Sequence, residues 1–183
     1  MFYKILGNIK ENFIVASGKG GTGKSTFCIN WAITLKKHFD LEVLINDFDD
    51  NKDLSKKFFD IEQTDTEVAE IYKKENPDEF KNLLFNKYGV TYLNSSSSLK
   101  EISGITPKAK EAYLQFLKNT LPNYQICIHN APQGIEDDSM IRDILPFITT
   151  AIFVTNHGIE CGDQIINIIK EITSFSNQHP DSP

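Results

Sequence analysis

The sequence predicts an α/β fold in which a parallel sheet is flanked by helices on both faces. Short apolar runs typical of buried strands alternate along the chain with longer stretches in which apolar residues recur at helical spacing. A glycine-rich loop joins the first strand-like run to the first helix-like stretch, and ligands of such folds bind where a strand ends. With 183 residues, 40% of them hydrophobic, we expect one domain over residues 1–183.

The first half of the chain contains two expected strands and several helical stretches. Residues 13–16 form an apolar run suited to a buried strand, and residues 27–35 form an apolar stretch suited to a buried helix. Residues 41–45 give the second strand. Residues 64–86 carry helical stretches that are interrupted near Pro77, because proline favours the first turn of a new helix.

The second half continues the alternation of strands and helices. We expect strands at residues 89–93, 126–128 and 151–154, with a helix at residues 108–121 where alanine, tyrosine, phenylalanine and leucine recur at helical spacing. A last helix is expected at residues 163–175, and its isoleucines are interpreted as core packing.

The loop after the first expected strand matches the phosphate-loop pattern G-x-x-x-x-G-K-[ST] from Gly18 to Ser25. Glycines let successive backbone N–H groups point at phosphate oxygens without obstruction by a side chain. Lys24 can place an ammonium against the β- and γ-phosphates, and the Ser25 hydroxyl can ligate Mg²⁺. The expected nucleotide-binding residues are Gly18, Lys19, Gly20, Gly21, Thr22, Gly23, Lys24, Ser25 and Thr26.

A second lysine, Lys19, follows the first glycine of this loop. The run from Gly18 to Thr26 resembles the deviant phosphate loop of the MinD/ParA/Mrp family of phosphate-loop ATPases, which includes the nitrogenase iron protein. The resemblance covers about residues 12–172. It implies ATP and Mg²⁺ as ligands, and an ATP-dependent homodimer in which Lys19 reaches the phosphates of the other subunit. It thereby implies catalytic roles for Lys19 and Lys24.

Two aspartates, Asp47 and Asp49, follow the second expected strand. The same family characteristically carries Asp-x-Asp at this place. By resemblance, Asp47 is assigned to the Mg²⁺ shell, and Asp49 is assigned a catalytic role in activating water or in switching. The alternative is an acidic surface loop whose carboxylates are all solvated.

The loop after the strand at 126–128 departs from the family pattern. Family members carry Asp-Thr-Pro-Pro-Gly or a close variant here; Pro132 and Gly134 match, but Asn130 stands at the position of the aspartate that faces Mg²⁺. An amide oxygen accepts a hydrogen bond from a metal-bound water but brings no negative charge. We therefore expect Asn130 near the metal and slow hydrolysis. His129 is interpreted as a strand-end residue rather than a catalytic base.

Composition narrows the remaining possibilities. A net charge of −6 argues against broad non-specific binding to DNA, although it is compatible with a local DNA contact. The three cysteines lie far apart without a C-x-x-C pair, so neither zinc nor an iron–sulfur cluster is expected within one subunit. No apolar run approaches the roughly eighteen residues of a membrane span, and the N-terminus does not resemble a secretory signal. We expect a cytoplasmic protein.

These observations predict an ATPase that acts as a nucleotide-dependent dimerisation switch and positions or partitions an unidentified protein partner. Two alternatives stay open: a maturation ATPase for a metal cluster or metalloenzyme, and a weakly hydrolysing, nucleotide-dependent binding module. The chain ends soon after the last expected helix, whereas family members continue with further strands. We therefore expect either a C-terminally shortened family member or a fragment of a longer protein.

Overall fold

The structure is a computed structural model, which describes residues 10–49, 54, 56, 58–95, 106–132, 140–155, 166, 169, 170 and 173. Its strands are β1 (Glu11–Ala16), β2 (Val43–Asp47), β3 (Leu84–Lys87), β4 (Val90–Asn94), β5 (Ile126–Asn130) and β6 (Thr150–Phe153). Its α-helices are α2 (Lys24–Phe39), α4 (Asp65–Lys73), α6 (Pro107–Thr120) and α7 (Met140–Ile144). Short 3₁₀ helices are η1 (Pro77–Leu83), η2 (Leu121–Asn123) and η3 (Leu145–Phe147).

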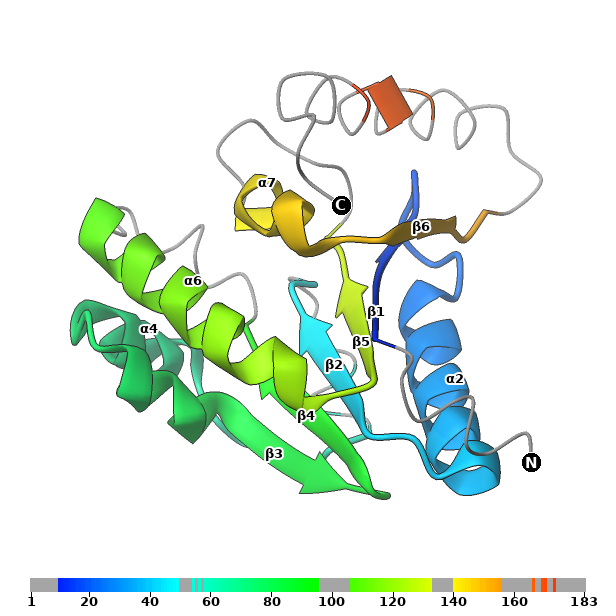
Figure 1. The fold of residues 1–183 in the computed structure, drawn as a ribbon, viewed down its shortest axis with the longest axis horizontal. Helices are drawn as coiled ribbons and strands as arrows, with labels where there is room; N and C mark the ends of the chain where they lie inside the picture. The colour runs from blue at the N-terminus through cyan, green and yellow to red at the C-terminus, as the bar shows by residue number, and fades with distance from the viewer. Residues whose placement is uncertain are drawn as a thin grey trace.

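The strands form one six-stranded sheet in the order β3-β4-β2-β5-β1-β6 (Figure 1). All neighbouring pairs are parallel except β3 and β4. Strand β5 lies between β1 and β2, so the carboxyl ends of these three strands meet at one edge of the sheet. Ligands of parallel α/β sheets bind at this edge, and the loops that carry the expected site residues leave the sheet here.

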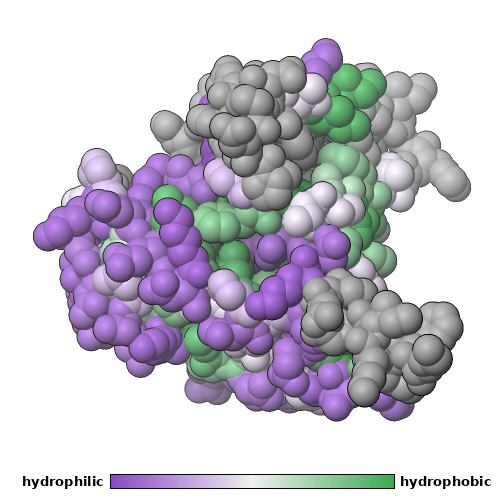
Figure 2. Space-filling model, in the orientation of Figure 1, coloured by the Kyte–Doolittle hydropathy of each residue, from purple (hydrophilic) through white to green (hydrophobic). Residues whose placement is uncertain are grey.

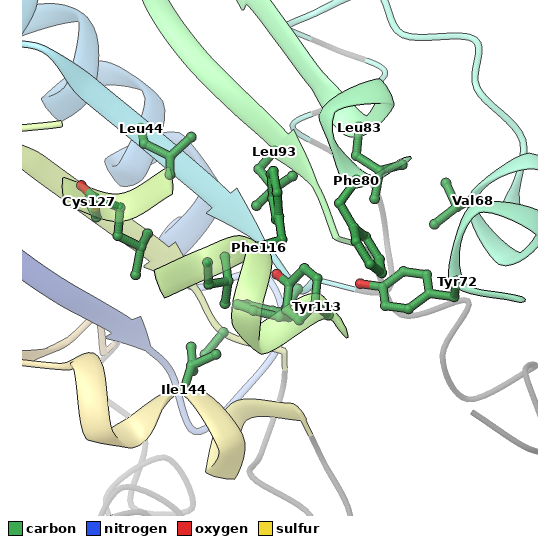
Figure 3. Close-up of a cluster of buried hydrophobic side chains, with 14 of the residues drawn as sticks. Leu44, Val68, Tyr72, Phe80, Leu83, Leu93, Tyr113, Phe116, Cys127 and Ile144 are labelled. Atoms are coloured by element: carbon green, nitrogen blue, oxygen red, sulfur yellow. The ribbon is translucent and has the colours of Figure 1, made fainter. Parts of the chain in front are cut away.

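Each face of the sheet carries its own apolar cluster, because side chains alternate along every strand. Ile14, Leu44 and Cys127 point to the face covered by α4, η1 and α6, where the buried aromatic rings of Tyr72, Phe80, Tyr113 and Phe116 gather (Figure 3). Their neighbours along the strands, including Val15 and Ile45, point to the opposite face and pack against Cys28, Ile29 and Ala32 of α2. The prediction of a parallel sheet with helices on both faces is confirmed.

The outer faces of the helices fit this layered arrangement. In the view of Figure 2, the surface over α4 and α6 is predominantly hydrophilic. Helix α4 begins with a capping box, in which Thr64 and Glu67 satisfy each other's backbone N–H groups. Helix α6 begins at Pro107 after the cap Thr106, whose hydroxyl accepts the N–H of Ala109 at 3.0 Å.

The expected helical stretches of residues 64–86 are confirmed for α4 and for η1, which begins at Pro77, but residues 84–86 belong to a strand. Residues after Pro77 form the 3₁₀ helix η1, and the chain then enters the edge strand β3. Tyr88 and Gly89 have φ angles of 57° and 73°, which is the left-handed conformation of a two-residue hairpin turn. This turn reverses the chain, so β3 pairs antiparallel with β4.

The last expected helix lies mostly outside the described residues. Four residues of this stretch are described, and all are helical: Ile166, Ile169, Lys170 and Thr173. Ile166 and Ile169 expose 49% and 45% of their surface. The interpretation of the isoleucines as core packing is therefore wrong for these two. Gly134 and Cys161 also lie outside the described part. Among the described residues, no helix is long and apolar enough to cross a membrane.

Candidate functional site

The phosphate loop connects the end of β1 to the first residue of α2, as the motif requires. Gly21 and Gly23 have φ angles of 76° and 90°, and an added Cβ would meet no atom within 4 Å at either position. Glycine is thus favoured by the left-handed backbone and not by lack of space. Gly23 caps α2, whose N-terminal N–H groups give this end of the helix a partial positive charge.

The loop surrounds a pocket of about 230 Å³. Its lining consists of Ser17, Lys19, Gly20, Gly21, Thr22, Gly23, Lys24, Ser25, Thr26 and Asp49. Every expected nucleotide-binding residue therefore lines the pocket except Gly18, which is buried. Lys19 is exposed, whereas Lys24 has only 6% of its surface accessible. The pocket is built of backbone amides, hydroxyls and lysines, which are the donors that bind phosphate.

Four residues behind this pocket form a closed hydrogen-bonded ring, which we call the Lys24 ring: Lys24, Asp49, Asp47 and Asn130. Lys24 Nζ donates to Asp49 Oδ2 at 2.8 Å and to Asn130 Oδ1 at 2.9 Å. Asn130 Nδ2 donates to Asp47 Oδ1 at 2.7 Å. The same Asp47 oxygen accepts the backbone N–H of Asp49 at 3.1 Å, which closes the ring. Asn130 thus accepts a hydrogen bond through its amide oxygen and donates one through its amide nitrogen.

The Lys24 ring is shielded from solvent. Asp47 and Asn130 are fully buried, and the hydroxyl of the buried Tyr92 donates to Asp47 Oδ2 at 2.6 Å. Burial raises the pKa of Asp47 to about 6, although the hydrogen bonds from Tyr92 and Asn130 oppose this rise. Asp47 is therefore easier to protonate in the folded protein than in the unfolded chain.

The structure separates the two aspartates that the sequence assigned to magnesium and water. Asp49 lines the pocket, and its Oδ2 accepts the Ser25 hydroxyl at 3.5 Å. Asp47 does not line the pocket, and both of its oxygens accept hydrogen bonds from protein donors. The expected metal role of Asp47 stays a prediction that this geometry does not favour, because Asp49 is the carboxylate beside Ser25.

A magnesium ion fits the oxygen donors of the pocket. Among the residues that the structure describes, no group of three or more His, Cys, Asp or Glu side chains could hold a metal by itself. Mg²⁺ does not need such a group, because it usually binds one or two protein oxygens together with phosphates and water. Ser25 and Asp49 supply two oxygens, whereas Asn130 Oδ1 lies behind Lys24 and outside the pocket lining.

Sequence reasoning did not identify Tyr92 or the polar network on the opposite side of β2. In this network the Ser95 hydroxyl donates to Asn46 Oδ1 at 2.6 Å and lies 2.7 Å from the Tyr113 hydroxyl. Asn46 Nδ2 lies 3.2 Å from His129 Nδ1. Polar residues inside otherwise aliphatic strands, such as Asn46 and Tyr92, are the signal that could have indicated buried partners.

His129 lies in β5, fully buried, and does not line the pocket. Among the residues that the structure describes, its Nε2 atom has no hydrogen-bond partner, and burial lowers the pKa of His129 from 6.5 to about 3. A proton carried by the unfolded chain is therefore lost on folding at mildly acidic pH. This state does not suit a base that must exchange protons with a ligand, and it favours a structural role.

We expect His129 to make the fold less stable as the pH falls below about 6.5. At about pH 5, its contribution to the free energy of unfolding should be lower by about 2 kcal/mol than at about pH 7. Asp47 acts with the opposite sign, since its raised pKa favours the fold as the pH falls through about 6. Urea unfolding of the wild type and His129→Gln separates the two, because Asp47 is present in both.

When the pH falls from about 7 to about 5, the free energy of unfolding of His129→Gln should rise by about 2 kcal/mol relative to that of the wild type. Parallel stability curves for wild type and His129→Gln would contradict the buried neutral imidazole.

Comparison with known proteins adds a family and a set of similar folds. The family model described as CbiA, the CobQ/CobB/MinD/ParA nucleotide binding domain, matches residues 13–175. A search of curated proteins found no match.

Several solved structures share the fold at low sequence identity. A plasmid partition protein from Borrelia burgdorferi is 18% identical with a TM-score of 0.72, and the match covers 91% of this chain and 74% of that one. Cobyrinic acid a,c-diamide synthase from Mycobacterium smegmatis, with bound ADP and magnesium, is 16% identical with a TM-score of 0.69, covering 92% and 69%. A ParA family ATPase from Chlorobium tepidum is 16% identical with a TM-score of 0.68, covering 88% and 67%.

Proposed function

The chain belongs to the CobQ/CobB/MinD/ParA nucleotide-binding domain family, and we propose that it is an ATPase switch whose ATP-bound form dimerises and positions or partitions a protein partner. The observation that carries this proposal is the pocket of the phosphate loop, where buried Lys24 and exposed Lys19 line the same cavity with Asp49. The partition protein and the ParA family ATPase of similar fold support this choice of function.

Some residues of the pocket are suited to bind phosphate, and others are suited to bind the metal. The loop amides and Lys24 would bind the phosphates, and the oxygens of Ser25 and Asp49 would hold Mg²⁺. When bound, the ion would supply positive charge that stabilises negative charge developing on the phosphates. In the present arrangement Asp49 and Asn130 accept the hydrogen bonds of Lys24. A phosphate therefore competes with these two acceptors for the ammonium, which frees Asp49 to orient a water molecule.

Hydrolysis is proposed to be slow because Asn130 replaces a carboxylate. The amide contributes no negative charge toward the metal, and its Nδ2 is committed to Asp47 at 2.7 Å. This feature also favours a second candidate function, a nucleotide-dependent binding module with weak turnover. Steady-state phosphate release, measured with and without an excess of Mg²⁺, distinguishes a switch that hydrolyses ATP repeatedly from a module that keeps its nucleotide bound.

The dimer is tested through Lys19. Light scattering should show a doubled mass with Mg²⁺ and a non-hydrolysable ATP analogue, but not with ADP. Lys19→Ala should lower turnover by about 10³-fold, the lower end of the effect of a cation supplied in trans, and spare nucleotide binding by the monomer. Lys37→Ala, at an exposed lysine of α2, is the matched control. An unchanged monomer with every nucleotide would rule out the dimer.

A further inference from the structure

We infer that Tyr92 is a positioning residue of the nucleotide site, which fixes Asp49 and Lys24 through the buried carboxylate of Asp47. The inference rests on the proposed function, since it concerns the same pocket. Tyr92 itself does not line the pocket, and its hydroxyl acts at 2.6 Å on Asp47 Oδ2. Asp49 is therefore two hydrogen bonds away from the Tyr92 hydroxyl, and Lys24 is three away.

The sheet places Tyr92 where it can reach Asp47. Strand β4 runs parallel to β2, with Tyr92 beside Ile45, and Asp47 follows two residues later on the same face of β2. The ring of Tyr92 is fully buried and stacks on Phe59, with centroids 4.4 Å apart and planes at 25°. Packing therefore holds the ring, and the hydroxyl is the part that acts on the carboxylate.

Asp47 connects Tyr92 to the Lys24 ring because its other oxygen, Oδ1, accepts hydrogen bonds from two members of the ring. Asp47 Oδ1 accepts the backbone N–H of Asp49 and the side-chain amide of Asn130. The Asn130 amide in turn accepts a hydrogen bond from Lys24. A rotation of the Asp47 carboxylate would disturb the positions of both Asp49 and Lys24, two charged residues that line the pocket.

Loss of the Tyr92 hydroxyl would drive such a rotation. A fully buried carboxylate oxygen that loses its donor keeps the cost of desolvation without the compensating hydrogen bond. The carboxylate lowers this cost by turning toward another donor. Because members of a buried polar network depend on one another, one missing hydroxyl should change the geometry of the whole Lys24 ring.

Tyr92→Phe removes only the hydroxyl and keeps the stacked ring, so it is the variant to test. Tyr113→Phe is the matched control: Tyr113 is also fully buried, and its hydroxyl contacts Ser95 and Asn46 rather than Asp47. Melting temperature, kcat, KM and the gain in ATP affinity on adding Mg²⁺ are measured for the wild type and both variants.

Tyr92→Phe should lower kcat by roughly 10- to 100-fold, the scale of a misplacement by about 1 Å, while KM changes less than about threefold. It should also reduce the Mg²⁺-dependent gain in ATP affinity, because Asp49 is displaced. Tyr113→Phe should lower the melting temperature to a similar degree and keep kcat and the Mg²⁺ effect of the wild type.

Equal kcat and equal Mg²⁺ effects in wild type and Tyr92→Phe would overturn the inference. Equal losses in both variants would also overturn it, because they would reveal a general structural role. A wild type that binds ATP without turnover would instead overturn the proposed ATPase, and the Mg²⁺ effect on affinity would still decide the role of Tyr92. A wild type that binds no nucleotide would overturn both.

Discussion

Lys24→Ala is expected to weaken ATP binding at least about 100-fold, because it removes charge-assisted hydrogen bonds to the phosphates worth about 3 kcal/mol or more in total. The loop amides remain, but they cannot replace an ammonium at the β- and γ-phosphates. Phosphate release should fall to background. Calorimetric titration with ATP and Mg²⁺, together with a phosphate-release assay, measures both effects.

The same substitution should also destabilise the protein without nucleotide. Lys24 is buried and hydrogen-bonded to Asp49 and Asn130, so its loss leaves both acceptors without this donor and Asp49 without its buried ion-pair partner. Lys24→Met keeps the apolar stem and separates lost packing from lost charge, and Lys37→Ala on the exposed side of α2 is the control. Unchanged affinity and unchanged phosphate release in Lys24→Ala would refute the phosphate-binding role of the loop.

The phosphate loop and the layered sheet could be predicted from the sequence because both depend on local patterns. Glycine spacing encodes the loop, as the left-handed angles at Gly21 and Gly23 illustrate. Short apolar runs encode the buried strands, and helical spacing encodes α6. In each of these cases the decisive contacts lie within a few residues of one another or repeat along one element.

The hydrogen bonds of the Lys24 ring could not be predicted in the same way, because its members come from the start of α2, from β2 and the loop after it, and from β5. Asp47 and Asn130 are 83 positions apart, and Asp47 and Tyr92 are 45 positions apart. Their contacts depend on β2 lying between β4 and β5, which no local pattern specifies. Strand β3 was missed for a related reason, since a short edge strand after a 3₁₀ helix has neither a long apolar run nor a helical period.

Asn130→Asp is the variant that tests the departure from the family pattern. We expect it to lower the stability of the nucleotide-free protein and to strengthen Mg²⁺ binding with nucleotide. A carboxylate at this position would place an oxygen about where Asn130 Nδ2 now donates to Asp47 at 2.7 Å. Two buried carboxylates so close cannot both stay ionised at low cost, and one must hold a proton or turn away. The nucleotide-free protein should lose about 1–3 kcal/mol of stability at neutral pH, and less at acidic pH where the shared proton is available.

With nucleotide bound, the added charge should act in the opposite direction. A carboxylate at residue 130 lies outside the pocket lining, but its charge should lower the Mg²⁺ concentration needed for half-maximal phosphate release. It should also raise the rate by roughly tenfold or more, since about 1.4 kcal/mol corresponds to a factor of ten. Asn46→Asp is the matched control, because it also puts a charge on a fully buried asparagine, one whose partners are His129, Ser95 and Tyr113. It should lose stability without gaining magnesium affinity. Identical Mg²⁺ curves for the wild type and Asn130→Asp would place residue 130 outside the influence of the metal, and unchanged stability would mean that Asn130 does not bridge Lys24 and Asp47 in solution.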